Sequence, residues 1–153
     1  MMELNLRADA RYAIACPTSM GVRITPDNRL AVHHSNHFYM QATSAETNVL
    51  SITSSLGREC LALTKFVKGN PIAQFIKNDL RARNIAYEGV EVDQGGPWGF
   101  RHQFNIADSG FGLRPPGCGT TGRERWAAPC PSASSIWSVF SAGRAWAFCT
   151  CPA

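Results

Sequence analysis

Cys60-Leu61-Ala62-Leu63-Thr64-Lys65-Phe66-Val67 is a mostly apolar run, and Asn70-Pro71-Ile72-Ala73 follows it after a short turn. The first run has the length and composition of a buried strand. The second places an asparagine directly before a proline, which is typical of a helix start. The apolar residues that recur on one face of that helix are Ile72, Phe75, Ile76 and Leu80. The pattern therefore predicts a buried strand followed by an amphipathic helix.

The same alternation extends in both directions from this unit. Short apolar runs bounded by proline, glycine or polar residues predict strands at residues 12–16, 21–25, 37–41, 85–92 and 98–106. A further helix is expected from Thr43, which lies three residues before Glu46 as in a capping box, to a stop at Gly57. The order of strands and helices predicts an α/β layered fold with a largely parallel sheet.

Length and charge limit the kinds of partner. A chain of 153 residues with 44% hydrophobic content can bury one ordinary core. The net charge of +4 comes from scattered residues without a basic run, so a nucleic-acid partner is not indicated. No stretch approaches the roughly 18–20 apolar residues that span a bilayer, so no membrane partner is expected. Without an export signal, the six cysteines predict reduced thiols in the cytoplasm.

The composition changes just after Pro115-Pro116. Residues 117–153 contain no lysine and no aspartate, but they hold most of the six cysteines, at Cys118, Cys130, Cys149 and Cys151. Such a composition is unlike that of ordinary globular sequence. We therefore expect one domain, or part of one, over residues 1–116, followed by an irregular, disordered tail over residues 117–153.

Several motifs in order resemble one family. They are Arg23-Ile24-Thr25-Pro26, Ser44-Ala45-Glu46-Thr47-Asn48-Val49, Thr64-Lys65-Phe66-Val67, Asn70-Pro71-Ile72 and Asp79-Leu80-Arg81. Each is short, but their order and spacing are similar to the N-terminal part of the PfkB (ribokinase-like) carbohydrate kinases, in particular the 2-keto-3-deoxygluconate kinases. The resemblance covers about residues 18 to 116.

The resemblance implies a ribokinase-like layered sheet with a small β-lid, here truncated. It also implies an ATP-dependent phosphoryl transfer to a hydroxyl of a small sugar or sugar acid, with Mg²⁺ bound to the nucleotide. By the same resemblance, Asn48 and Arg23 are the candidate substrate-binding residues. The family's Gly-Glu pair falls on Thr18-Ser19 and its glycine run on Thr43-Ser44-Ala45. A Cβ there fills space that a substrate would use, which leaves the identity of the sugar open.

The phosphoryl-transfer half of the family has no counterpart in this sequence. Relatives carry a Gly-Ala-Gly-Asp or Gly-Gly-Gly-Asp motif that supplies the base and the anion-binding backbone. The segment from Gly117 to Gly122 is rich in glycine, but no helical pattern and no lysine follow it. We therefore expect no catalytic residue and no metal site in this chain, poor binding of ATP and Mg²⁺, and no kinase activity.

A shifted reading frame is our hypothesis for the tail. Read one base back, Gly117 onward can encode Arg-Val-Trp-Asn-Asp-Arg-Ala, which is similar to the segment that relatives carry after a lid strand. The region from Ala133 to Cys149 and beyond can likewise encode Val-Leu-Asp-Leu-Glu-Arg-Val-Leu and Val-Leu-His-Leu-Ser-Gly. Only the first base of each restored codon is substantially free, so a long accidental match is not expected.

Three functions stay open at this stage, and with them whether the chain is an enzyme. The first is a carbohydrate kinase by descent that has lost its activity. The second is a non-catalytic fragment that binds sugar or forms a homodimer through the lid, since the family's lid often makes the dimer interface. The third is a zinc protein that uses His33, His34 and His37 or Cys149-Thr150-Cys151. We interpret those histidines as lid surface and those cysteines as a product of the shifted frame.

Overall fold

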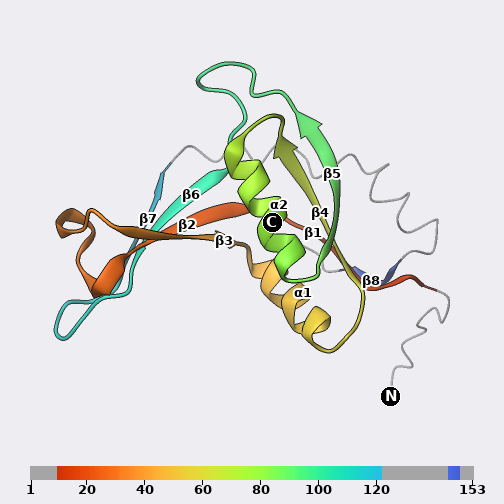
Figure 1. The fold of residues 1–153 in the computed structure, drawn as a ribbon, viewed down its shortest axis with the longest axis horizontal. Coiled ribbons are helices and arrows are strands. Elements are labelled where there is room, and N and C mark those ends of the chain that lie inside the picture. The colour runs from red at the N-terminus through yellow and green to blue at the C-terminus, as the bar shows by residue number, and fades with distance from the viewer. Residues whose placement is uncertain (1–9, 122–144, 149–153) are drawn as a thin grey trace.

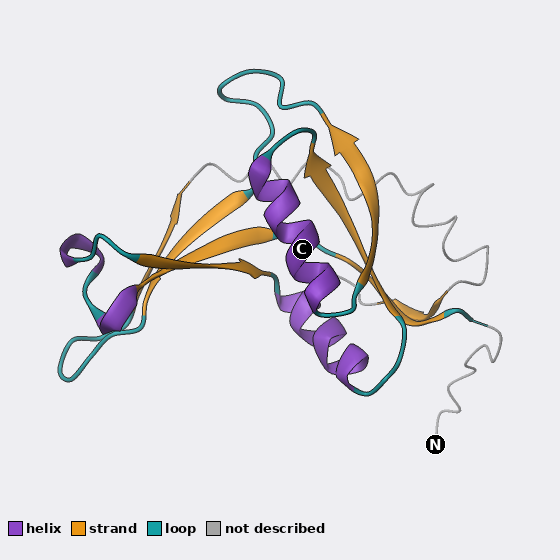
Figure 2. Ribbon diagram, in the orientation of Figure 1, coloured by secondary structure: helices purple, strands orange, loops and turns teal. Residues whose placement is uncertain are grey.

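The structure is a computed structural model, and it describes residues 10–121 and 145–148. These residues form two four-stranded sheets and two α-helices (Figures 1 and 2). The core sheet has the order β5-β4-β1-β8, built from β1 (Tyr12–Pro17), β4 (Cys60–Val67), β5 (Ala86–Val92) and β8 (Ala145–Phe148). The lid sheet has the order β3-β2-β6-β7, built from β2 (Gly21–Pro26), β3 (Phe38–Thr43), β6 (Gln103–Asp108) and β7 (Gly117–Thr121).

The core sheet is parallel throughout. Strand β1 pairs with β4 and β8, and β4 pairs with β5. Parallel strands of one sheet need crossover connections, and two helices provide them: α1 (Ala45–Ser55) before β4 and α2 (Pro71–Ala82) after it. Both helices lie on the same side of the core sheet (Figure 1). The α/β class with a parallel sheet is therefore confirmed.

The main hydrophobic core lies between this sheet and the helices. From β4, alternate residues Cys60, Ala62 and Phe66 face the helices. They meet Leu50 of α1 and a row on α2 that consists of Ala73, Ile76 and Leu80. Of the predicted face of α2, Ile76 and Leu80 are buried, Ile72 and Phe75 are partly buried against the same core, and Ala73 was not predicted. Asn70 caps that helix by accepting a hydrogen bond from the Ile72 N–H at 2.8 Å.

The lid sheet projects away from the helices, toward the left in Figure 1. Strands β2 and β3 are antiparallel and are joined by two short 3₁₀ helices, η1 (Asp27–Arg29) and η2 (Val32–His34). Strand β6 lies parallel to β2 on its other side, and β7 is antiparallel to β6. The sequence-based prediction of a small β-lid is confirmed.

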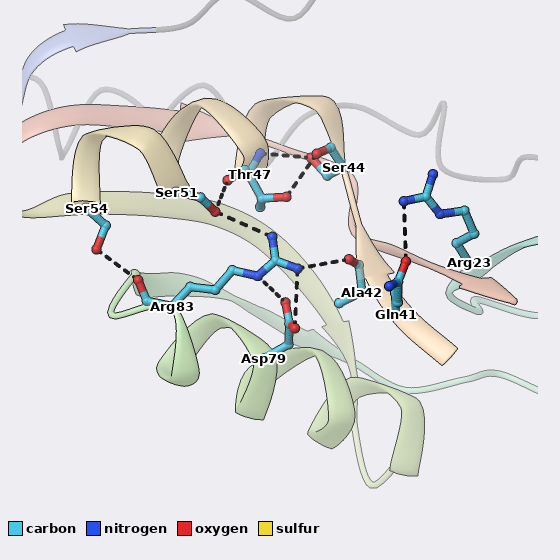
Figure 3. Close-up of polar contacts among 9 residues, drawn as sticks. All are labelled: Arg23, Gln41, Ala42, Ser44, Thr47, Ser51, Ser54, Asp79 and Arg83. Carbon is cyan, nitrogen blue, oxygen red and sulfur yellow. Dashed lines mark hydrogen bonds and ion pairs between the residues drawn. The ribbon is translucent and has the colours of Figure 1, made fainter. Parts of the chain in front are cut away.

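An arginine network connects the helices to the root of the lid, the end of the β2–β3 pair at Gly21 and Thr43 (Figure 3). The Arg83 guanidinium, at the end of α2, forms an ion pair with Asp79 at 2.9 Å and reaches the carbonyl oxygen of Ala42 in β3 at 3.5 Å. It also contacts Ser51 Oγ of α1 at 3.4 Å. In return, Ser54 Oγ donates to the Arg83 carbonyl at 2.8 Å. One side chain therefore joins α1, α2 and β3.

Three segments differ from the sequence-based expectation. The helix α1 is capped by Ser44 and not by Thr43, so the predicted capping box is wrong by one residue. Residues 98–102 form a turn and not a strand, because the Phe100 N–H bonds back to the Gln94 carbonyl at 2.9 Å, and β6 begins only at Gln103. In the tail, residues 117–121 and 145–148 are strands, while residues 122–144 and 149–153 lie outside the described residues.

Candidate functional site at the root of the lid

Strand ends, helix starts and the root of the lid meet at one edge of the core sheet. Strand β1 ends at Pro17 and strand β4 at Val67. The crossover helix before β4 begins at the cap Ser44, and the crossover helix after β4 begins at the cap Asn70. We call this the carboxyl edge. In open α/β sheets, ligands bind in the crevice outside the carboxyl ends of the strands. The lid strand β2 starts there, only a few residues after β1, so the lid begins next to the place where a ligand is expected.

A compact polar cluster lies at the carboxyl edge. Ser44 Oγ donates to a carboxylate oxygen of Glu46 at 2.6 Å, and Thr18 Oγ1 contacts the same oxygen at 3.1 Å. The Thr18 and Ser44 hydroxyls are 2.5 Å apart. Ser44 also accepts a hydrogen bond from the Thr47 N–H at 3.3 Å, as an N-cap does (Figure 3). The negative charge of Glu46 is favourable here because the first turn of a helix carries a partial positive charge.

Substitution of Ser44 with alanine is expected to lower the free energy of unfolding by about 1 kcal/mol, because the cap and its bond to Thr47 are lost. Urea denaturation followed by circular dichroism measures this. Ser55→Ala is the matched control, since Ser55 is exposed on the same helix and bonds only the carbonyl of Ser51 one turn back. Equal effects of the two substitutions would contradict the capping role.

The lid sheet has two chemically different faces. Successive side chains of a strand alternate between faces, and paired residues share a face. The polar face consists of Arg23, Thr25, Tyr39, Gln41, Gln103 and Asn105. The apolar face consists of Val22, Ile24, Met40, Ala42, Phe104 and Ile106. Near the root, Val22 and Ala42 of the apolar face are buried in the main core, so the polar face is the side left available to solutes.

Arg23 lies in the middle of the polar face. Its neighbours in register are Gln41 on β3 and Asn105 on β6. The Arg23 guanidinium donates to Gln41 Oε1 at 3.4 Å (Figure 3), and Gln103 Nε2 donates to Asn105 Oδ1 at 3.1 Å. The side chain of Arg23 is exposed. An exposed cation flanked by amides offers both donors and acceptors, which suits a ligand with hydroxyl and carboxylate groups.

Asn48 lies on a different element. It is exposed on α1, one turn after Ser44, and its backbone N–H bonds the Ser44 carbonyl at 3.4 Å. Of the two predicted site residues, the structure thus places Arg23 beside Gln41 on the lid and Asn48 on the helix that starts at the root of the lid. The connection Thr43-Ser44 joins the two elements.

The residues that sequence analysis missed are those that depend on strand pairing. Thr18 and Ser44 were recognised only as positions where the family pattern changes, and Glu46 only as the partner of Thr43 in the predicted capping box. Gln41, Gln103 and Asn105 were not singled out, and their signal was the alternation of polar and apolar residues in 37–41 and 103–106. That alternation becomes a polar face only when the partner strands and the register are known.

In residues 10–121 and 145–148, no group of three or more His, Cys, Asp or Glu side chains is placed to hold a metal ion. The pair Cys149-Thr150-Cys151 lies outside these residues. No helix in the same described part is both long and apolar enough to cross a membrane.

The fold is shared with solved carbohydrate kinases. A PfkB-family carbohydrate kinase from Listeria grayi matches with a TM-score of 0.64 and 19% identity, over 72% of this chain and 33% of its own. The 2-dehydro-3-deoxygluconokinase of Thermotoga maritima matches with a TM-score of 0.63 and 16% identity, over 71% and 32%. An uncharacterized sugar kinase from Pyrococcus horikoshii in complex with ATP matches with a TM-score of 0.58 and 16% identity, over 70% and 33%.

The chain therefore has the fold of the N-terminal part of the PfkB carbohydrate kinases, as its motifs predicted. It spans about a third of the length of these structures. No family model and no curated protein matches the sequence.

Proposed function

We propose that this chain is the sugar-side part of a PfkB carbohydrate kinase, and that it binds a small sugar or sugar acid between the polar face of the lid and the carboxyl edge. The observation that carries the proposal is the position of Arg23, exposed between Gln41 and Asn105 on a lid that rises from the carboxyl edge of a kinase-like sheet. The shared fold with solved sugar kinases supports it.

In this proposal, Arg23 and Asn48 bind the substrate from two sides. The guanidinium of Arg23 donates to a hydroxyl or carboxylate oxygen, and the amide of Asn48 pairs with neighbouring hydroxyls as donor and acceptor. The Thr18, Ser44 and Glu46 side chains narrow the space at the edge and help to select the sugar. When bound, ATP with Mg²⁺ would supply the phosphoryl group, and we assign its binding to the part of the relatives that this chain does not span.

We further propose that the chain alone binds ATP poorly and does not turn over. The assay is ADP release by purified protein with ATP, Mg²⁺ and a panel of sugars and sugar acids. Turnover above the background of a sample without protein would contradict this part of the proposal.

The buried free thiols of Cys16 and Cys60 support a reducing, cytoplasmic location.

Sugar binding is the direct test of the site. With a sugar or sugar acid that binds in titration calorimetry, Arg23→Ala is expected to raise Kd on the order of 10- to 100-fold, because a charged hydrogen bond contributes about 1.5–3 kcal/mol. Asn48→Ala should raise it by about 3- to 10-fold, as expected for neutral hydrogen bonds. Arg58→Ala is the control, since Arg58 is exposed at the opposite edge, before β4. Unchanged Kd values in the Arg23 and Asn48 variants would contradict the site.

We also propose that residues 117–153, which follow Pro116, are read in a shifted frame. The composition break and the family-like sequence of the alternative frame support it. Strand β7 begins at Gly117, the first residue that the shift would change, and it pairs with β6 in spite of its glycines. Resequencing of the coding DNA across Pro116 tests the idea, and an intact frame in an independent isolate would contradict it.

A second candidate function is assembly without catalysis, through the apolar face of the lid. Beyond the part that α2 covers, Met40 on this face and its neighbour Phe38 are 41% and 42% exposed. An uncovered apolar sheet surface favours association, and a second copy of the chain offers a surface of the same kind. Sedimentation velocity should show a dimer that Met40→Lys shifts to monomer. A monomer at all concentrations would exclude this function.

A further inference from the structure

His102 is a buried histidine at the junction of the two sheets. It immediately precedes β6 in the sequence, and its side chain is 2% exposed. The other three histidines, His33, His34 and His37, are exposed in and near η2. A buried imidazole must have its ring nitrogens satisfied, because an unpaired polar group in the interior is costly.

Both ring nitrogens of His102 contact backbone groups, one from each sheet. Nδ1 lies 3.2 Å from the carbonyl oxygen of Met20, the residue before β2. Nε2 accepts a hydrogen bond from the backbone N–H of Val67, the last residue of β4, at 3.4 Å. The ring thus joins the start of two adjacent lid strands, β2 and β6, to the carboxyl end of the central core strand.

These two partners fix the protonation state of the ring. A carbonyl oxygen can only accept, so Nδ1 must carry a proton, and a backbone N–H can only donate, so Nε2 must be bare. The neutral ring with its proton on Nδ1 satisfies both contacts. A protonated ring would have N–H groups on both nitrogens, and one of them would oppose the Val67 N–H.

The surroundings also favour the neutral ring. The ring of Phe66 lies beside it, with centroids 6.3 Å apart. Burial lowers the pKa of His102, and the positive charge of Lys77 on α2 acts in the same direction, against the Met20 carbonyl. Lys77 is itself paired with Glu91 of β5 at 2.6 Å, so the cation that acts on His102 has a partner carboxylate.

We propose that His102 is a pH-sensitive pin that holds the lid to the core sheet and thereby positions Arg23 over the carboxyl edge. Neutral His102 keeps β2 and β6 fastened to β4, and protonation removes the acceptor for Val67 and releases the root of the lid. The consequence for ligand binding, through the position of Arg23, rests on the proposed function. The attachment of the lid to the core sheet by His102 does not.

The direction of the pH effect follows from the lowered pKa. An unfolded histidine titrates at its ordinary value of 6.5. Above that pH both states are neutral and the contribution of His102 to stability is complete. As the pH falls from 6.5 through the lower pKa of the folded state, His102 takes up a proton when the lid is released but stays neutral while the lid is attached. The state with the released lid is therefore stabilised relative to the state with the attached lid. Opening of the lid should become more favourable by up to about tenfold per pH unit in this window.

Hydrogen exchange followed by mass spectrometry of the full chain, corrected for intrinsic exchange rates, tests the pin between pH 7.5 and 5. Peptides from β2 and β6, and the amide of Val67, should lose protection by up to about tenfold per pH unit below 6.5, while peptides from β5 and from the part of β4 before Val67 should keep it. His102→Gln should remove this pH dependence, because the amide does not titrate. His33→Gln, which changes an exposed histidine, should retain it.

Nitrogen chemical shifts of the wild-type imidazole supply a test that needs no variant. They should report a proton on Nδ1 and a titration below pH 6.5. A proton on Nε2, a titration at or above 6.5, or lid protection that does not depend on pH would each overturn the proposal. The two proposals fail separately: the exchange result does not depend on a sugar, and the effect of the Arg23 variant on sugar binding is measured at pH 7.5, where His102 is neutral in the folded and the unfolded state.

Discussion

Phe66→Ala is expected to lower the free energy of unfolding by about 3–5 kcal/mol, the range found for removal of a buried phenylalanine. Phe66 is 1% exposed and is among the largest fully buried side chains of the described residues. Its ring contacts the Tyr87 ring edge-on with centroids 5.6 Å apart, and the Lys77 ammonium lies 4.7 Å from its centre. Alanine would remove the apolar contacts and leave a cavity at the junction of β4, β5 and α2.

This cost is large relative to the 5–15 kcal/mol that stabilise typical domains, so the variant should be partly unfolded at 37 °C. Urea denaturation at 15 °C, followed by tryptophan fluorescence and circular dichroism, measures the change. Phe66→Leu keeps most of the volume and should cost less than about 1.5 kcal/mol. Phe111→Ala is the matched control, because Phe111 is 65% exposed and its loss should matter by less than about 0.5 kcal/mol. Equal effects of Phe66→Ala and Phe111→Ala would show that the core lies elsewhere.

Gly89→Ala is expected to cost about 3 kcal/mol, at the upper end for an overpacked site. Gly89 lies opposite Thr64 in the β4–β5 ladder, and a Cβ at this position would lie 1.7 Å from the Thr64 carbonyl oxygen. The obstacle is backbone, so no rotation of a side chain can relieve it. The strands must separate locally, and the ladder around the pair weakens.

The matched control for Gly89 is a glycine in another strand. Gly119 of β7 has no heavy atom within 4 Å of the position that a Cβ would take, so Gly119→Ala should be neutral or slightly stabilising. Thermal unfolding of both variants, with hydrogen exchange of the β4 and β5 peptides, gives the comparison. A Gly89 variant as stable as the Gly119 variant would mean that β5 does not pair with β4 in this register.

The parts of the fold that were predictable from sequence are those whose signals are local. The cap at Asn70, the proline after it and the apolar spacing on α2 are properties of neighbouring residues, and the structure confirms them. The apolar run of β4 similarly identified a strand buried on both faces. The strand predicted at 98–106 failed in its first half because the turn expected at residues 94–97 extends further, through the bonds of the Gly99 and Phe100 N–H groups to Gly96 and Gln94. Strand β7 was missed because pairing with β6, and not its glycines, decides its conformation.

The candidate site was less predictable for a physical reason. Arg23 and Asn48 were found by resemblance to a family, and the sequence alone does not say that Gln41 and Asn105 flank Arg23. That arrangement depends on the register of three strands that are distant in sequence. The cap was assigned to Thr43 because Thr43 lies three residues before Glu46, and only the backbone geometry selects the neighbouring hydroxyl residue, Ser44.

The two-sided lid also limits how such a protein can change over generations. Because side chains in β2 alternate strictly, one inserted or deleted residue would turn Arg23 toward the α2 core and Val22 toward the polar face. The polar face can therefore change by point substitution at alternate positions, but not by a change of length within the strand. Length variation should be confined to the turns beyond Pro26 and Asp108, where the pairing of β2 and β6 has ended.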